Sequence, residues 1–99
     1  MSTALKKQLP DRPEQTKTET QKITELETAT ETIAAYIGYL TTQMHIEEDK
    51  PTPDELKIRA LKAQKNALLD ERKSITPDNE EMIAKALYVY GPIVKALYI

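Results

Sequence analysis

A nearly uncharged stretch of 18 residues, from Met82 to Ile99, limits most strongly what this chain can fold into. Lys85 and Lys95 are its only charged side chains, and its apolar residues recur in steps of three and four, the spacing of a helical face. These residues form two adjacent stripes, which are Ile83, Leu87, Tyr90, Val94 and Leu97, and Met82, Ala86, Val89, Ile93 and Ala96. A helix that is apolar over so much of its circumference is expected to be buried, either within the chain or against another molecule.

The preceding sequence also favours helices. Only two glycines, and neither phenylalanine nor tryptophan, leave little material for β-hairpins. A first helix is predicted from about Thr16 to Met44, where Thr16 and Glu19 have the spacing of a capping box. Its apolar seam consists of Ile23, Leu26, Thr30, Ile33, Ile37, Leu40 and Met44. The residues that flank this seam are small or aromatic, which indicates a face broad enough for two neighbouring helices; they are Ala29, Ala34 and Tyr36.

Two threonine-proline pairs predict the starts of two more helices. Thr52 precedes Pro53 and Thr76 precedes Pro77, and this order is typical of an N-cap followed by the first helical residue. The second helix is expected to run to about Ser74, antiparallel to the first. It carries two stripes, an alanine-rich one that would allow close helix approach and a bulkier one beside it. The first is Leu56, Ala60, Ala63 and Ala67, and the second is Ile58, Leu61, Leu68 and Ile75.

The expected fold class is all-α. Gly91 and Pro92 interrupt the third helix, but its apolar stripes stay in phase across them, so we expect a kinked helix or two nearly collinear ones. We predict that this helix packs in the groove of an antiparallel hairpin, giving a three- to four-helix bundle over residues 16–99. Residues 1–15 are polar and contain two prolines, which predicts a flexible N-terminal arm.

Composition narrows the possible environments. The chain has a net charge of -2 and no cysteine, so it has neither disulfides nor thiolate metal sites. Its first residues lack the apolar segment of a signal peptide, and we therefore expect a cytoplasmic protein. Between Lys85 and Lys95 lie about nine residues, or about 14 Å of helix against a bilayer core of about 30 Å, so no membrane span is expected.

Candidate catalytic and metal-binding residues are sparse. The single histidine, His45, precedes Glu48 and Asp49 by three and four residues, which is a weak pattern for a metal site. A place in the last helical turn explains His45 better, because the helix dipole favours positive charge there. Both serines lie far from His45 in sequence, and Glu80 and Glu81 fit the first turn of a helix. We therefore expect no enzymatic activity, no cofactor and no metal.

The leading functional interpretation is protein interaction. A two-helix groove covers only part of the apolar third helix, so its remaining apolar surface is expected to bind a second copy of the chain or another protein. A homodimer is the simplest such assembly. The expected partner-binding residues are Tyr88, Tyr90, Ile93, Val94, Leu97, Tyr98 and Ile99.

The alternative is a small nucleic-acid-binding regulator, such as an antitoxin or a phage-type repressor. Basic residues crowd the second helix and the arm, and they are Lys57, Arg59, Lys62, Lys65, Arg72, Lys73, Lys6, Lys7 and Arg12. Such side chains can neutralise phosphates. The third helix, however, offers little besides Lys85 to base edges, so a helix-turn-helix mode of recognition is disfavoured.

Overall fold

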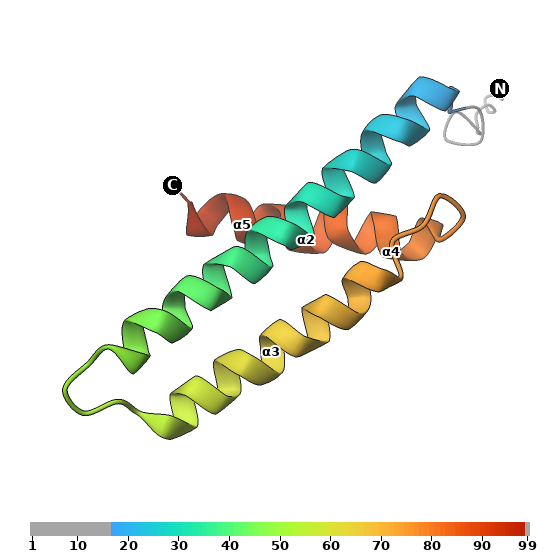
Figure 1. Ribbon diagram of the computed structural model, residues 1–99. Coiled ribbons are helices and arrows are strands. Elements are labelled where there is room, and N and C mark those ends of the chain that lie inside the picture. The colour runs from blue at the N-terminus through green and yellow to red at the C-terminus, as the bar shows by residue number, and fades with distance from the viewer. Residues whose placement is uncertain (1–16, 99) are drawn as a thin grey trace, which may run out of the picture.

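The computed structural model describes residues 17–98, which form helices joined by short turns and contain no strand (Figure 1). In chain order the elements are α2 (Glu19–Glu48), α3 (Glu55–Lys73), α4 (Glu80–Lys85), the π-helical turn η2 (Ala86–Tyr90) and α5 (Gly91–Leu97). The last three follow one another without a break, and we refer to them together as the third helix. The predicted flexible arm over residues 1–15 lies outside the described residues, as do Thr16 and Ile99.

All three helix starts lie further along the chain than predicted. Thr18 caps α2 in a capping box with Gln21, in which each side chain accepts a hydrogen bond from the other residue's backbone N–H. Asp54 caps α3 by accepting from two backbone N–H groups, and Asn79 caps α4 by accepting from the Met82 N–H. The two predicted threonine-proline caps are therefore wrong. Aspartate and asparagine are better N-caps than threonine, and both occur just downstream of the prolines.

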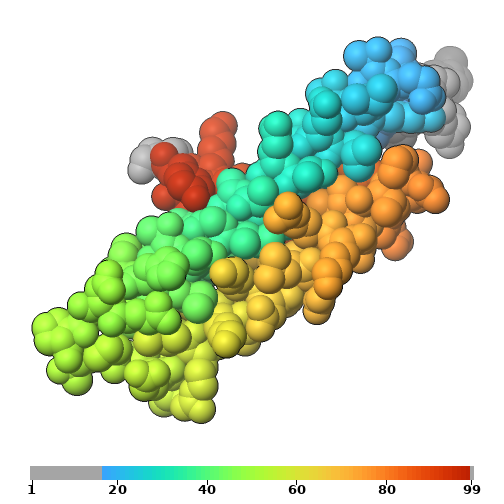
Figure 2. Space-filling view, viewed as in Figure 1, coloured from blue at the N-terminus to red at the C-terminus, as the bar shows by residue number. Residues whose placement is uncertain are grey.

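The helices α2 and α3 form the predicted antiparallel hairpin, but the third helix crosses α2 on one side of it (Figure 1). It does not lie along the groove between α2 and α3, so the predicted bundle packing is not confirmed. The molecule is a rod of 67 × 25 × 21 Å. Figure 2 shows α2 and α3 side by side along this rod, with the end of α5 projecting beside α2. The buried apolar residues are Ala29, Ile33, Ile37, Leu40, Leu68, Met82, Ile83, Ala86 and Tyr90.

The buried face of α2 departs from the predicted seam in its first half. Ile23 and Thr30 are exposed, whereas Ala29, which was predicted to flank the seam, is fully buried. A strict seven-residue seam drifts by about 20° per heptad around a straight helix, and α2 is 30 residues long. The side of α2 that faces its neighbours therefore includes Ala29 in place of Thr30.

Only the bulkier stripe of α3 packs inward. Leu68 is fully buried, and Leu61 packs against the core, because large side chains remove more apolar area from water. The alanine-rich stripe, predicted to permit close helix approach, is exposed along its whole length from Leu56 to Ala67. Gly38 of α2 likewise makes no close approach, since a Cβ atom built there meets nothing within 4 Å.

The third helix continues through Gly91 and Pro92 by means of the π turn. The Gly91 N–H donates to the carbonyl of Ala86, five residues back. Pro92 has no N–H and its ring clashes with the carbonyl of a regular preceding α turn, and the wider turn relieves both problems. Within residues 17–98, no helix has both the length and the apolar content needed to cross a bilayer.

Candidate interaction surface

The inner face of the third helix is fixed on α2 by apolar and aromatic packing. Met82, Ile83 and Ala86 are buried at the crossing, together with the ring of Tyr90. That ring meets Tyr36 of α2 edge to face, with centroids 5.6 Å apart. Aromatic pairs with this geometry stabilise packing beyond the area they bury.

A second aromatic contact fixes the end of the third helix. Tyr98 lies edge-on to Tyr39 of α2 at 6.1 Å, and its hydroxyl donates to the backbone carbonyl of Ala35 at 3.0 Å. The middle and the end of the third helix are therefore held against α2.

A polar contact joins the third helix to α3. The Tyr90 hydroxyl and the Lys85 ammonium each donate to the carboxylate of Glu71, and the ammonium also lies 5.5 Å from the centre of the Tyr90 ring. Burial raises the pKa of Glu71, but the hydrogen bonds from Lys85 and Tyr90 outweigh it, so the pKa lies below its usual value. Glu71 is thus held as an anion that ties α3 to the crossing.

Several apolar residues are exposed along the outward side of the third helix. Tyr88 is 70% exposed, Val89 51% and Ile93 39%, and Pro92 and Ala96 between and beyond them are exposed as well. We call these five residues the outer stripe. Glu81 lies before the stripe and Lys95 beside its end, both exposed, and among the described residues neither has an ion-pair partner within 4.0 Å.

The π turn explains why this stripe faces outward. It adds one residue to its turn, so every later position is rotated relative to a regular α-helix. Met82 and Ala86 of the second predicted apolar stripe are buried, but Val89, Ile93 and Ala96 of the same stripe are exposed. Tyr90 takes the buried position that a regular helix would give to Val89.

The predicted partner-binding residues do not share one environment. Tyr88 and Ile93 lie in the outer stripe, and Tyr98 is exposed but already bound to α2. Tyr90 is buried, which makes it a core residue, and Val94 and Leu97 are half-buried. Ile99 lies outside the described residues. Sequence reasoning missed Val89, Pro92 and Ala96; the Gly91–Pro92 pair was the available signal, because a proline inside a helix requires a local change of the turn.

A groove of about 520 Å³ adjoins Tyr88 between the start of α2 and α4. Ile83, Ala84 and Leu87 provide apolar lining, and Lys17, Lys22, Glu25 and Glu80 provide charged groups. Lys17 pairs with Glu25 at 2.8 Å, and this hydrogen bond raises the pKa of Lys17. Lys22 pairs with Glu19 at 3.4 Å. The paired cations leave the groove without a clear preference for a ligand of either charge.

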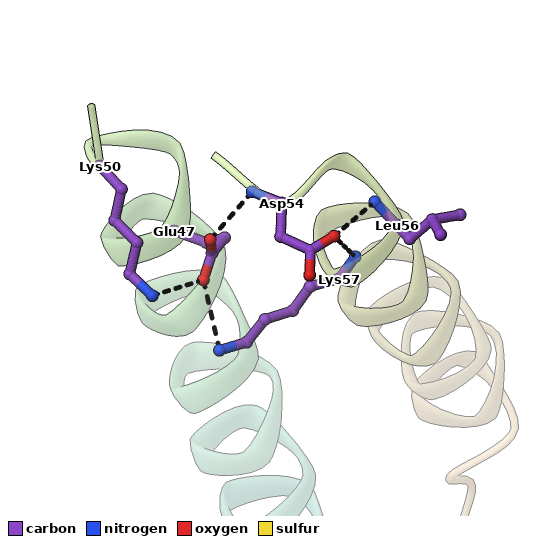
Figure 3. A network of polar contacts seen from close by, with 5 residues as sticks. All are labelled: Glu47, Lys50, Asp54, Leu56 and Lys57. Carbon is purple, nitrogen blue, oxygen red and sulfur yellow. Dashed lines mark hydrogen bonds and ion pairs between the residues drawn. The ribbon is translucent and has the colours of Figure 1, made fainter. Parts of the chain in front are cut away.

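The hairpin turn contains a separate polar cluster around Glu47, which is only 3% exposed (Figure 3). Its carboxylate accepts from Lys50 at 2.9 Å and from the Asp54 backbone N–H at 3.0 Å, and Lys57 of α3 lies 3.3 Å away. The Lys50 hydrogen bond, followed by the Asp54 N–H, lowers the pKa of Glu47 to about 2. The cluster fixes the end of α2 to the start of α3, and all its groups are engaged in doing so.

Two further candidates from the sequence, His45 and the basic residues of α3, lie within residues 17–98, whereas Lys6, Lys7 and Arg12 lie outside the described residues. His45 lies 3.4 Å from Glu48, and residues 17–98 contain no group of three or more side chains arranged to hold a metal ion. On α3, Arg59, Lys62 and Lys73 are exposed, and none has an acidic partner within 4.0 Å among the described residues. These cations are free to meet phosphates or solvent.

The chain matches no known protein-family model, and searches of curated proteins and of solved structures likewise give no match.

Proposed function

We propose that this protein is a non-enzymatic interaction protein that self-associates through the outer stripe of its third helix. The observation that carries the proposal is the exposure of Tyr88, Val89 and Ile93 within six residues of the third helix. Exposed apolar patches of this kind are typical of protein contact sites, and tyrosine is enriched among the residues that dominate binding energy.

Rigidity supports this function. Tyr90 anchors the middle of the third helix, and Tyr98 anchors its end. The outer stripe is therefore presented on a helix whose position is set before any partner binds. Preorganised surfaces lose less conformational entropy on association than mobile ones, which favours affinity.

The molar mass in solution tests the proposal. It is measured by light scattering after size exclusion. As the protein concentration increases, the mass is expected to rise from the 11.3 kDa of one chain towards twice that value. The simplest product is a two-fold dimer that uses the same surface of both copies. A mass that stays at 11.3 kDa up to several hundred micromolar would contradict self-association.

Nucleic-acid binding is a second candidate, supported by the exposed cations of α3. Apart from Lys57, which pairs with Glu47, the basic residues of this helix have no ion-pair partner among the described residues. A gel-shift experiment with DNA and RNA at about 50 and 200 mM salt tests it, because phosphate contacts weaken steeply over that range. We expect no shift at either salt concentration, and a shift lost at the higher one would favour this candidate.

The predicted cytoplasmic residence and the predicted lack of enzymatic activity stay predictions, since nothing in residues 17–98 tests them.

A further inference from the structure

We infer that the outer stripe pairs with the outer stripe of a second copy in antiparallel orientation, with Tyr88 near the two-fold axis. The inference rests on the proposed self-association and adds the direction and register of the contact. It is carried by the distribution of charge around the stripe.

The charges at the two ends of the stripe are opposite in sign. Glu81 lies seven residues before Tyr88, and Lys95 lies seven residues after it. Both side chains are exposed, and neither forms an ion pair within the described part of the chain. Lys85, by contrast, is already engaged by Glu71.

Antiparallel pairing about Tyr88 brings these opposite charges together. A residue seven positions before the axis faces the residue seven positions after it in the second copy, so Glu81 of each copy meets Lys95 of the other. A parallel pair places Glu81 against Glu81 and Lys95 against Lys95, and each of those contacts is repulsive. The antiparallel arrangement also opposes the two helix dipoles, which is the favourable orientation.

The apolar residues fit the same arrangement. The exposed ring of Tyr88 faces the Tyr88 ring of the second copy across the axis, and the two rings can pack offset or edge to face. Val89 and Ile93 are also exposed and lie four residues apart, so they can extend the contact beyond the rings. The surface is thus complementary to itself, which a closed two-fold dimer requires.

Reversal of charge tests this register. Glu81→Lys places two lysines together at each end of the dimer, and Lys95→Glu places two glutamates together. Each single change is expected to weaken dimerisation at least about tenfold at low salt, because attraction becomes repulsion at two symmetric positions. The double variant Glu81→Lys/Lys95→Glu restores attraction and is expected to dimerise like the wild type. Glu27→Lys, an exposed acid on α2, changes net charge as Glu81→Lys does and serves as the control.

Sedimentation equilibrium gives the dissociation constants, and circular dichroism shows that each variant remains helical. If the wild type dimerises but neither reversal weakens it, or the double variant does not recover, the antiparallel register is wrong while self-association stands. If the wild type is monomeric, both the register and the proposed function are wrong. Tyr88→Cys gives an independent check in a chain without other cysteines, since oxidation is expected to cross-link the dimer through position 88.

Discussion

The two faces of the third helix have similar composition but different surroundings. Ile83 and Tyr90 on the inner face are at most 9% exposed, and the one polar group among them, the Tyr90 hydroxyl, is satisfied by Glu71. Tyr88 and Ile93 on the outer face are 39 to 70% exposed. Hydrophobicity alone therefore does not separate the residues that fold this chain from those available to a partner.

The difference arises from the partners available within the chain. The inner face meets α2 at the crossing, where Ile33 is fully buried and Tyr36 receives the edge of Tyr90. No described element covers the outer face, because α2 and α3 form a two-helix hairpin whose own contact uses their inward sides. In a rod 21 to 25 Å thick, the third helix keeps one side open to solvent.

The same substitution on the two faces gives the largest expected contrast. Ile83→Ala leaves a cavity at the crossing and is expected to lower the free energy of unfolding by about 2 to 4 kcal/mol. Ile93→Ala is expected to cost the monomer under about 1 kcal/mol and to weaken dimerisation instead. Urea denaturation at low protein concentration measures the first effect, and sedimentation equilibrium measures the second. Equal losses of stability at both sites would show that the outer face belongs to the core.

The tyrosine hydroxyls give a smaller contrast between the same faces. Tyr90→Phe removes a hydrogen bond to an ionised carboxylate in a partly buried site, and the expected loss is about 1.5 to 3 kcal/mol. Tyr88→Phe removes a hydroxyl on an exposed ring and is expected to change monomer stability by less than about 0.5 kcal/mol. Thermal unfolding of the two variants at matched, low concentration measures both effects. If Tyr90→Phe leaves the stability unchanged, the hydrogen bond to Glu71 does not stabilise the packing of α3 on the third helix.

Acid conditions separate the contribution of the hairpin turn from that of the third helix. The folded pKa of Glu47, about 2, lies below its usual 4.5, so its stabilisation is complete above pH 4.5 and is lost as pH falls from there towards 2. Glu47→Gln is therefore expected to lower the melting temperature at pH 7 and to melt like the wild type near pH 2. Part of the acid dependence should remain in this variant, because the pKa of Glu71 is also lowered in the folded protein. A constant difference between the two proteins at all pH values would contradict this role of Glu47.

The sequence predicted the elements better than their packing. Three helices, the antiparallel hairpin and the continuation of the helix beyond Pro92 followed from apolar spacing and turn residues. The side from which the third helix packs on α2 could not be predicted in this way. The helix has two apolar stripes, and their spacing does not indicate which of them packs against the rest of the chain. The π turn was equally inaccessible to a spacing rule, and it decides that Val89 is exposed and Tyr90 buried. The predicted partner-binding residues are therefore divided between the two faces of the third helix.

The association state of a variant altered only on the outer face tests most directly the claim that one face folds the chain and the other binds a second copy. Val89→Glu/Ile93→Glu places two carboxylates in the outer stripe, whereas Leu56→Glu, at a position 71% exposed on α3, is the matched control. Sedimentation equilibrium with circular dichroism on the same samples is expected to show a folded monomer for the double variant and a folded dimer for the control and the wild type. A double variant that remains a dimer, or that loses its helical structure at low concentration, would contradict the division of roles between the two faces.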